Sequence, residues 1–133
     1  MAETDKADEK KIILAVDDMA VSLTTIRTIL QHEYDVRLAK SATLALEILK
    51  QMSVDLILLD IEMPEISGLE FMGLMKKSPE LKNVPVIFVT SHANPQFIDQ
   101  AMAFEAEGYI VKPFIPDALI KRVKSVLGEE SSE

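Results

Sequence analysis

Residues 54–68 read VDLILLDIEMPEISG, and this stretch decides the fold of the chain. Its apolar residues 56–59 form an unbroken run that leads directly into the carboxylate of Asp60. A short continuous apolar run is typical of a strand that is covered on both faces, as in a parallel sheet. Pro64 and Gly68 then indicate a loop. Asp60 is therefore predicted at the carboxyl end of a central strand, where open α/β sheets place their ligand crevice.

The length and composition of the chain favour one globular domain. Its 133 residues are 48% hydrophobic, which is enough for a single sizeable core. No apolar run approaches the roughly 18 residues that cross a bilayer, and the charged N-terminus lacks the apolar core of a secretory signal. The absence of cysteine excludes disulfides and suits a cytoplasmic protein. A net charge of -8 argues against direct binding to nucleic acid or anionic lipid.

Hydrophobic periodicity outside the central stretch predicts four further strands and five helices. The strands are expected near residues 12–16, 36–39, 84–89 and 108–111. The helices are expected near residues 19–31, 41–52, 69–77, 94–104 and 116–127. Asp18, Ser41 and Asn94 are predicted to cap three of these helices, with Pro95 at its favoured first position.

Strands that alternate with helices predict an α/β fold, a doubly wound parallel sheet with helices on both faces. Right-handed crossovers leave few topologies, and we expect the flavodoxin-like strand order 2-1-3-4-5. Residues 1–10 are expected to be a flexible lead-in, residues 11–127 the domain, and residues 128–133 an acidic, frayed tail.

Polar residues follow four of the predicted strands. Asp17 and Asp18 follow the first strand, Asp60 the third, Thr90 the fourth and Lys112 the fifth. Because parallel strands end at the same edge of a sheet, we expect these groups to meet around Asp60. Three carboxylates raise one another's pKa unless positive charge intervenes, and Lys112 with a divalent cation would supply it. An all-oxygen set favours Mg²⁺ over zinc, and a carboxylate beside such a metal, an ammonium and a hydroxyl is suited to accepting a phosphoryl group.

In these features the chain resembles the receiver domain of bacterial two-component response regulators, especially the single-domain chemotaxis and phosphorelay types. The resemblance covers residues 11–127. It rests on Asp17 and Asp18, residues 60–64 with Gly68, Thr90 with Ser91, and Tyr109 three residues before Lys112 and Pro113.

The resemblance implies a role for each matching residue. Asp60 would be the phosphoacceptor, supplied by a histidine kinase, a phosphotransfer protein or a small phosphodonor. Mg²⁺ would be bound by Asp18 directly, by Asp17 mainly through water, by Asp60, and by the backbone carbonyl of Glu62. Lys112 would bind the phosphoryl group, and Thr90 would move toward it.

The resemblance also implies how a signal would leave the site. Tyr109 would change rotamer together with Thr90 and alter the face formed by the fourth helix, the fifth strand and the fifth helix. A downstream protein or a second copy of the chain would bind there. Glu62 and His92 would flank the phosphoryl group and tune its hydrolysis. The chain would then be a signalling switch that catalyses only its own phosphorylation and dephosphorylation, rather than an enzyme.

Simpler interpretations stay open for these residues. Asp17 and Asp18 could serve only as helix caps. The hydroxyl of Thr90 could serve only as a hydrogen-bond partner for the start of the next helix. Tyr109 could be an ordinary core residue, and Lys112 a solvated charge. Glu62 and His92 could be exposed loop side chains.

Other functions with a similar fold are also open. A phosphatase of the haloacid dehalogenase kind uses a strand-end Asp with Mg²⁺, but it resembles this chain less, since it would carry Asp-x-Asp on the first strand and an added cap domain. A flavodoxin-like binding fold would need a phosphate-cradling loop after the first strand, where Asp17 and Asp18 would instead repel phosphate. A degenerate receiver that only binds partners is a further alternative.

The fourth predicted helix carries a wide apolar arc, which has two interpretations. Phe97, Ala101 and Phe104 form one stripe, with Ile98 and Met102 beside it. Apolar stripes usually pack in the core. Alternatively, Phe97 or Phe104 could belong to a docking surface.

Overall fold

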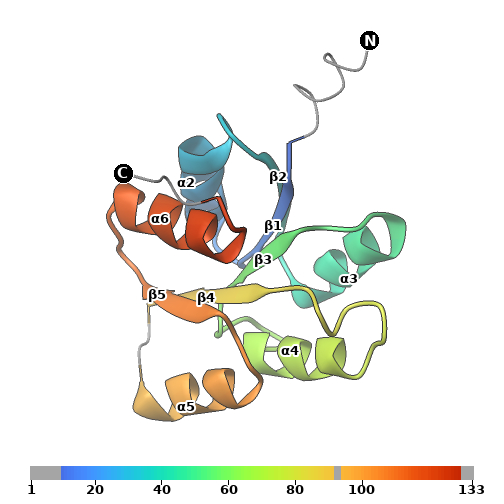
Figure 1. Cartoon of the computed structure of the whole chain (residues 1–133). Helices are drawn as coiled ribbons and strands as arrows, with labels where there is room; N and C mark the ends of the chain where they lie inside the picture. The colour runs from blue at the N-terminus through green and yellow to red at the C-terminus, as the bar shows by residue number, and fades with distance from the viewer. Residues whose placement is uncertain (1–9, 92–93, 130–133) are drawn as a thin grey trace.

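The structure is a computed structural model that describes residues 10–91 and 94–129, where five strands alternate with five helices (Figure 1). The strands are β1 (Ile12–Val16), β2 (Asp35–Ala39), β3 (Leu56–Leu59), β4 (Val86–Thr90) and β5 (Gly108–Val111). The helices are α2 (Ala20–Leu30), α3 (Ala42–Gln51), α4 (Gly68–Lys76), α5 (Pro95–Ala103) and α6 (Pro116–Val126). All neighbouring strands are parallel, in the order β2-β1-β3-β4-β5. The predicted fold class and strand order are confirmed.

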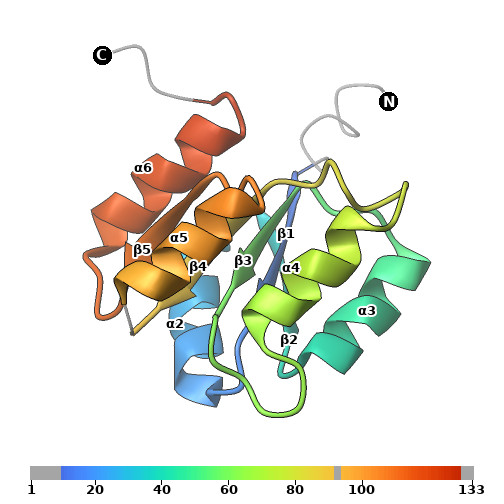
Figure 2. The same ribbon diagram turned by 90° about the horizontal axis from the view of Figure 1, so that it is seen from below.

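Helices cover both faces of the sheet, α2 and α6 on one face and α3, α4 and α5 on the other (Figures 1 and 2). Successive residues of β1, β3 and β4 point to opposite faces and so enter different cores. Leu14, Ile57 and Phe88 pack in the core under α3, α4 and α5. Ile13 and Ile87 pack in the core under α2 and α6. All four residues of β3 are buried, as its continuous apolar run predicted.

Two of the three predicted helix caps are present. Ser41 accepts a hydrogen bond from the N–H of Leu44 at 3.1 Å, and Asn94 accepts one from the N–H of Gln96 at 2.8 Å. Pro95 stands in the first turn of α5, as predicted. These polar side chains satisfy amide groups that the first turn of a helix leaves without partners.

The prediction that Asp18 caps the first helix is wrong. Helix α2 begins at Ala20 with Met19 as its N-cap residue, and no side chain caps it. The acid that binds the backbone before this helix is Asp17, whose Oδ1 accepts a hydrogen bond from the N–H of Met19 at 2.9 Å. Asp18 is therefore exposed at the end of β1 and has its carboxylate available for other chemistry.

The loop after β3 is held against the strand end by Gly68 and by a capping box. The N–H of Gly68 donates to the carbonyl of Ile61 at 2.8 Å, and a Cβ at Gly68 would collide with the carbonyl oxygen of Asp60. Ser67 and Glu70 exchange two hydrogen bonds of 2.8 and 3.1 Å at the start of α4. Only glycine fits this close approach, so Gly68 fixes the path of the loop beside Asp60.

The end of the described chain contacts residues near its beginning. Glu129 accepts a hydrogen bond of 2.8 Å from the hydroxyl of the buried Tyr34 and lies 3.4 Å from Nζ of Lys11. The same Lys11 ammonium donates to the carbonyl of Leu127 at 3.1 Å. Glu129 thus contacts the domain through its side chain, and the expected fraying of the tail stays a prediction. The predicted lead-in over residues 1–9 and the last residues, 130–133, lie outside the described part of the chain.

The apolar arc on α5 is mostly core. Ala101 is fully buried, and Phe97 and Phe104 are partly buried against the same core. Met102 is the exposed member of the arc, at 45%. The structure therefore supports packing rather than docking for the two phenylalanines. No helix in the described part of the chain is both long and apolar enough to cross a bilayer.

Candidate functional site

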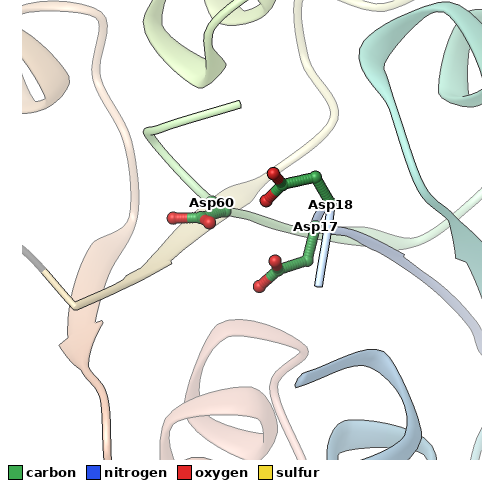
Figure 3. Close-up of side chains that lie close together, drawn as sticks. All are labelled: Asp17, Asp18 and Asp60. Atoms are coloured by element: carbon green, nitrogen blue, oxygen red, sulfur yellow. The ribbon is translucent and has the colours of Figure 1, made fainter. Parts of the chain in front are cut away.

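Three carboxylates meet at the carboxyl ends of β1 and β3. The pairing of Val16 with Leu59 places the next residues, Asp17 and Asp60, side by side. The N–H of Asp60 donates to the carbonyl of Val16 at 3.0 Å, which extends the ladder past the strand. Each of Asp17, Asp18 and Asp60 offers an oxygen atom within 4.8 Å of the others (Figure 3). The predicted convergence of these acids on one edge of the sheet is confirmed.

Among the described residues, the ammonium group of Lys112 lies beside these acids. Nζ of Lys112 is 2.8 Å from Oδ2 of Asp17 and 3.7 Å from Oδ2 of Asp60. The side chains are little exposed, 14% for Lys112, 2% for Asp17 and 8% for Asp60, so water screens these charges weakly. The N–H of Lys112 donates to the carbonyl of Thr90 at 2.8 Å, which ties the end of β5 to the end of β4.

The environment of Asp60 disfavours its ionised form. Burial, with a further contribution from the charge of Asp17, raises the pKa of Asp60 to about 6. Lys112 and the backbone N–H groups of Glu62 and Ile61 act in the opposite direction but do not cancel the increase. When all three acids are ionised, three carboxylates stand against one ammonium, so negative charge is in surplus at the site. A bound cation would relieve it.

The residues present fit a hard divalent cation. All three candidate ligands are carboxylates, and their oxygens lie within 4.8 Å of one another. Mg²⁺ binds oxygen at about 2.1 Å and keeps several waters beside one or two carboxylates, which suits this small, half-open cluster. Asp18 also lines a cavity of about 430 Å³ with Glu62, Met63 and Phe97, so an ion can reach the acids from solvent.

The remaining predicted residues occupy different environments. Thr90 is fully buried at the end of β4. Tyr109 is 39% exposed on β5, so its interpretation as an ordinary core residue is wrong. The side chain of Glu62 is exposed, whereas its backbone N–H donates to Asp60. The role of the Glu62 carbonyl as a metal ligand stays a prediction. His92 lies outside the described residues.

Sequence reasoning missed one residue of this site, Ser22. Its Oγ accepts a hydrogen bond of 3.1 Å from Nζ of Lys112. Ser22 stands in the first turn of α2, the helix that follows directly on β1 and its two acids. A hydroxyl in the first turn after a strand-end acid is the signal that could have pointed to it.

The curated proteins similar to this chain differ in how much of their own length the chain covers. One relative, described as a probable cyclic di-GMP phosphodiesterase from Vibrio cholerae serotype O1, is 39% identical over 123 residues. The match covers 91% of this chain but only 27% of that protein, so the chain spans about a quarter of the relative's length. The polar-differentiation response regulator DivK of Brucella ovis is 32% identical over 120 residues, which cover 90% of this chain and 98% of DivK.

Solved structures and a family model agree with these relatives. The chemotaxis protein CheY4 of Vibrio cholerae superposes with a TM-score of 0.84 at 30% identity, covering 89% of this chain and 99% of CheY4. A putative response regulator from Chloroflexus aurantiacus gives a TM-score of 0.85 at 26% identity, covering 90% of this chain and 99% of that one. The model of the response regulator receiver domain matches residues 13–124. The chain therefore belongs to the family of response regulator receiver domains, the family that its strand-end residues resemble.

Proposed function

We propose that Asp60 accepts a phosphoryl group from a phosphohistidine of a histidine kinase or phosphotransfer protein. The observation that carries this proposal is the grouping of Asp17, Asp18 and Asp60 within 4.8 Å, with the Lys112 ammonium 3.7 Å from Asp60. A pKa of about 6 leaves Asp60 mostly ionised at neutral pH, as a nucleophile must be. Membership of the receiver family supports the same reaction.

The reaction is a transfer between two nucleophiles. One oxygen of the ionised Asp60 forms a bond to phosphorus while the bond from phosphorus to the donor's imidazole nitrogen breaks. The electron pair of that bond stays on the imidazole nitrogen, which is left neutral or takes a proton from solvent. Lys112 offsets negative charge on the phosphoryl oxygens, and the N–H groups of Ile61 and Glu62 orient the carboxylate. Mg²⁺ held by Asp17, Asp18 and Asp60 would supply further positive charge.

Phosphorylation would then change the surface that partners recognise. Thr90 lies buried at the end of β4, and β4 pairs with β5, which carries Tyr109. We expect Thr90 to move toward the phosphoryl group and Tyr109 to change rotamer, which alters the face formed by α5, β5 and α6. Met102, Tyr109 and Val111 leave apolar surface exposed there, at 45%, 39% and 40%. A downstream protein or a second copy of the chain would bind this face in one state more tightly than in the other.

The chemistry proposed for the chain is limited to its own phosphorylation and dephosphorylation. It is a switch that is modified once per signal rather than an enzyme that turns over many substrates. Because its phosphodonors are made with ATP, we also propose the cytoplasm as its compartment. This rests on the receiver family of the chain.

The direct test is incubation with Mg²⁺ and a small acyl phosphate, followed by intact mass spectrometry. We expect a mass increase of one phosphoryl group, stable to acid and labile to base, that maps to Asp60. Asp60→Asn is the matched control and should show no adduct. Absence of an adduct with acyl phosphates and with phosphorylated kinases would refute the proposal, and sustained hydrolysis of many phosphate esters would favour a phosphatase instead.

A further inference from the structure

The Lys112 ammonium contacts side chains from three separate parts of the chain. Its Nζ donates to Oδ2 of Asp17 at 2.8 Å and to Oγ of Ser22 at 3.1 Å. Its distance to Oδ2 of Asp60, 3.7 Å, is too long for a hydrogen bond. An ammonium has three N–H donors in a fixed tetrahedral arrangement. Because two of these N–H groups are directed at Asp17 and Ser22, the third is available to a group bound at Asp60.

One hydrogen bond could not set this orientation. A lysine ammonium that is bonded only to Asp17 would still rotate about its Cε–Nζ bond, and its four-carbon stem is flexible. A second acceptor at a fixed place removes that rotation. Ser22 is such an acceptor, because the next residue, Leu23, is buried at 3% exposure and anchors the first turns of α2 on the core with Ile26.

A cavity beside Lys112 offers its side chain a second orientation. Ser22 and Lys112 line the wall of a cavity of about 410 Å³, together with Met19 and Phe114. Without the Ser22 hydroxyl, the lysine side chain could swing toward this space and toward water, where a charged head is well solvated. The hydrogen bond to Ser22 therefore competes with an outward orientation.

We propose that Ser22 is a positioning residue, which holds the Lys112 ammonium with one N–H directed at the phosphoryl group on Asp60. This inference rests on the proposed phosphorylation of Asp60. Ser22 acts through Lys112, since its Oγ accepts a hydrogen bond from that ammonium. Loss of Ser22 should therefore weaken phosphoryl binding without weakening cation binding.

The test uses three variants of the full chain. Ser22→Ala removes the hydroxyl, and Ser22→Thr keeps one at the same place. Thr28→Ala is the matched control, because it removes another hydroxyl of α2, one that donates to the carbonyl of Thr24 at 2.9 Å on the exposed side of the helix. Thermal unfolding of each variant checks that the fold is intact.

The first measurement needs no phosphoryl group. Relaxation of the ¹³C-labelled Cε methylene of Lys112 reports how tightly its ammonium is held. We expect clearly greater motion in Ser22→Ala than in the wild type, Ser22→Thr or Thr28→Ala. If Lys112 is as ordered in Ser22→Ala as in the wild type, the proposal is overturned, whether or not Asp60 is phosphorylated.

The second measurement compares two ligands by titration, Mg²⁺ alone and beryllofluoride, a phosphoryl analogue, in saturating Mg²⁺. A lost hydrogen bond to a charged group predicts about tenfold weaker beryllofluoride binding in Ser22→Ala. Mg²⁺ affinity should stay unchanged, and Ser22→Thr should bind both ligands as the wild type does. An equal loss for both ligands, or no loss for either, would overturn the proposal. A wild type that binds no beryllofluoride would refute the proposed function, while the ordering of Lys112 would still decide the role of Ser22.

Discussion

Replacing Asp60 by Asn should stabilise the metal-free protein at neutral pH. The Asp60 side chain is 8% exposed, and burial together with the charge of Asp17 raises its pKa from 3.8 to about 6. An elevated pKa means that the folded state holds the proton more tightly than the unfolded chain does. The ionised carboxylate therefore opposes folding, and an uncharged amide of the same shape should oppose it less.

The size and pH window of this effect follow from the pKa. Below pH 4 the acid is protonated in both states and costs nothing. Between pH 4 and pH 6 the folded state binds more protons than the unfolded state, so the free energy of unfolding falls as the pH rises. Above pH 6 the full cost is present, about two pH units at 1.36 kcal/mol each, or about 3 kcal/mol. The amide nitrogen of Asn cannot accept hydrogen bonds from backbone N–H groups, so we expect a net gain of about 1–3 kcal/mol.

Urea unfolding of both proteins in EDTA measures the difference. The Asn variant should be more stable at pH 7, and the gap should shrink toward pH 4. Added Mg²⁺ should stabilise the wild type more than the variant, because the ion binds only the folded acids. Asp99→Asn, at an exposed position of α5, is the control and should show little change. A variant that is less stable at pH 7, or a gap that does not vary with pH, would refute the reasoning and show that attraction to Lys112 outweighs burial.

Three further substitutions test the packing around the site and at the chain end by urea unfolding. Gly68→Ala should destabilise the protein by about 2–4 kcal/mol, because its Cβ would collide with backbone atoms at the end of β3, and an unchanged midpoint would contradict this. Gly73→Ala should stabilise it by about 0.5–1 kcal/mol, since alanine favours helix and its Cβ would lie 3.5 Å from the ring of Phe104, an ordinary contact. Tyr34→Phe should cost about 1 kcal/mol through the lost hydrogen bond to Glu129. Burial raises the pKa of Tyr34 above its usual value of 10.0, so the stability advantage of the wild type over Tyr34→Phe should shrink as the pH rises above 10.

The arrangement of the sheet and the meeting of its acids could be predicted from sequence because both depend on chain direction. In a parallel sheet every strand ends at the same edge, so residues that follow strands share that edge whatever their side chains do. The order of the strands then brings Asp17 next to Asp60 and leaves Lys112 within reach. These inferences need only element boundaries good to a residue or two, and the predicted boundaries were that good for β1 and β5.

The features that sequence could not predict concern contacts between particular atoms. Asp18 is a good cap residue by type, but the neighbouring Asp17 makes the turn, and sequence does not distinguish two adjacent acids. Tyr109 is exposed because β5 is an edge strand whose residues alternate between core and solvent. Ser22 resembles any serine on a solvated helix face until the path of Lys112 is known. Glu129 is separated from Tyr34 by 95 residues, and no local pattern records that contact.

The negative charge that destabilises the site is also what favours a bound cation there. Asp17 and Asp60 could lower their repulsion by moving apart, but they follow directly on Val16 and Leu59, which are paired in the ladder between β1 and β3. Separating the acids would break that ladder in the middle of the sheet, where all four residues of β3 are buried. The repulsion can therefore be relieved by protonation of a carboxylate or by a bound cation, whereas a phosphoryl group on Asp60 would add negative charge and increase the need for that cation. Both are binding events, so the rigidity of the sheet keeps the negative charges together and favours a bound cation, which is why the proposed phosphoryl transfer should depend on Mg²⁺.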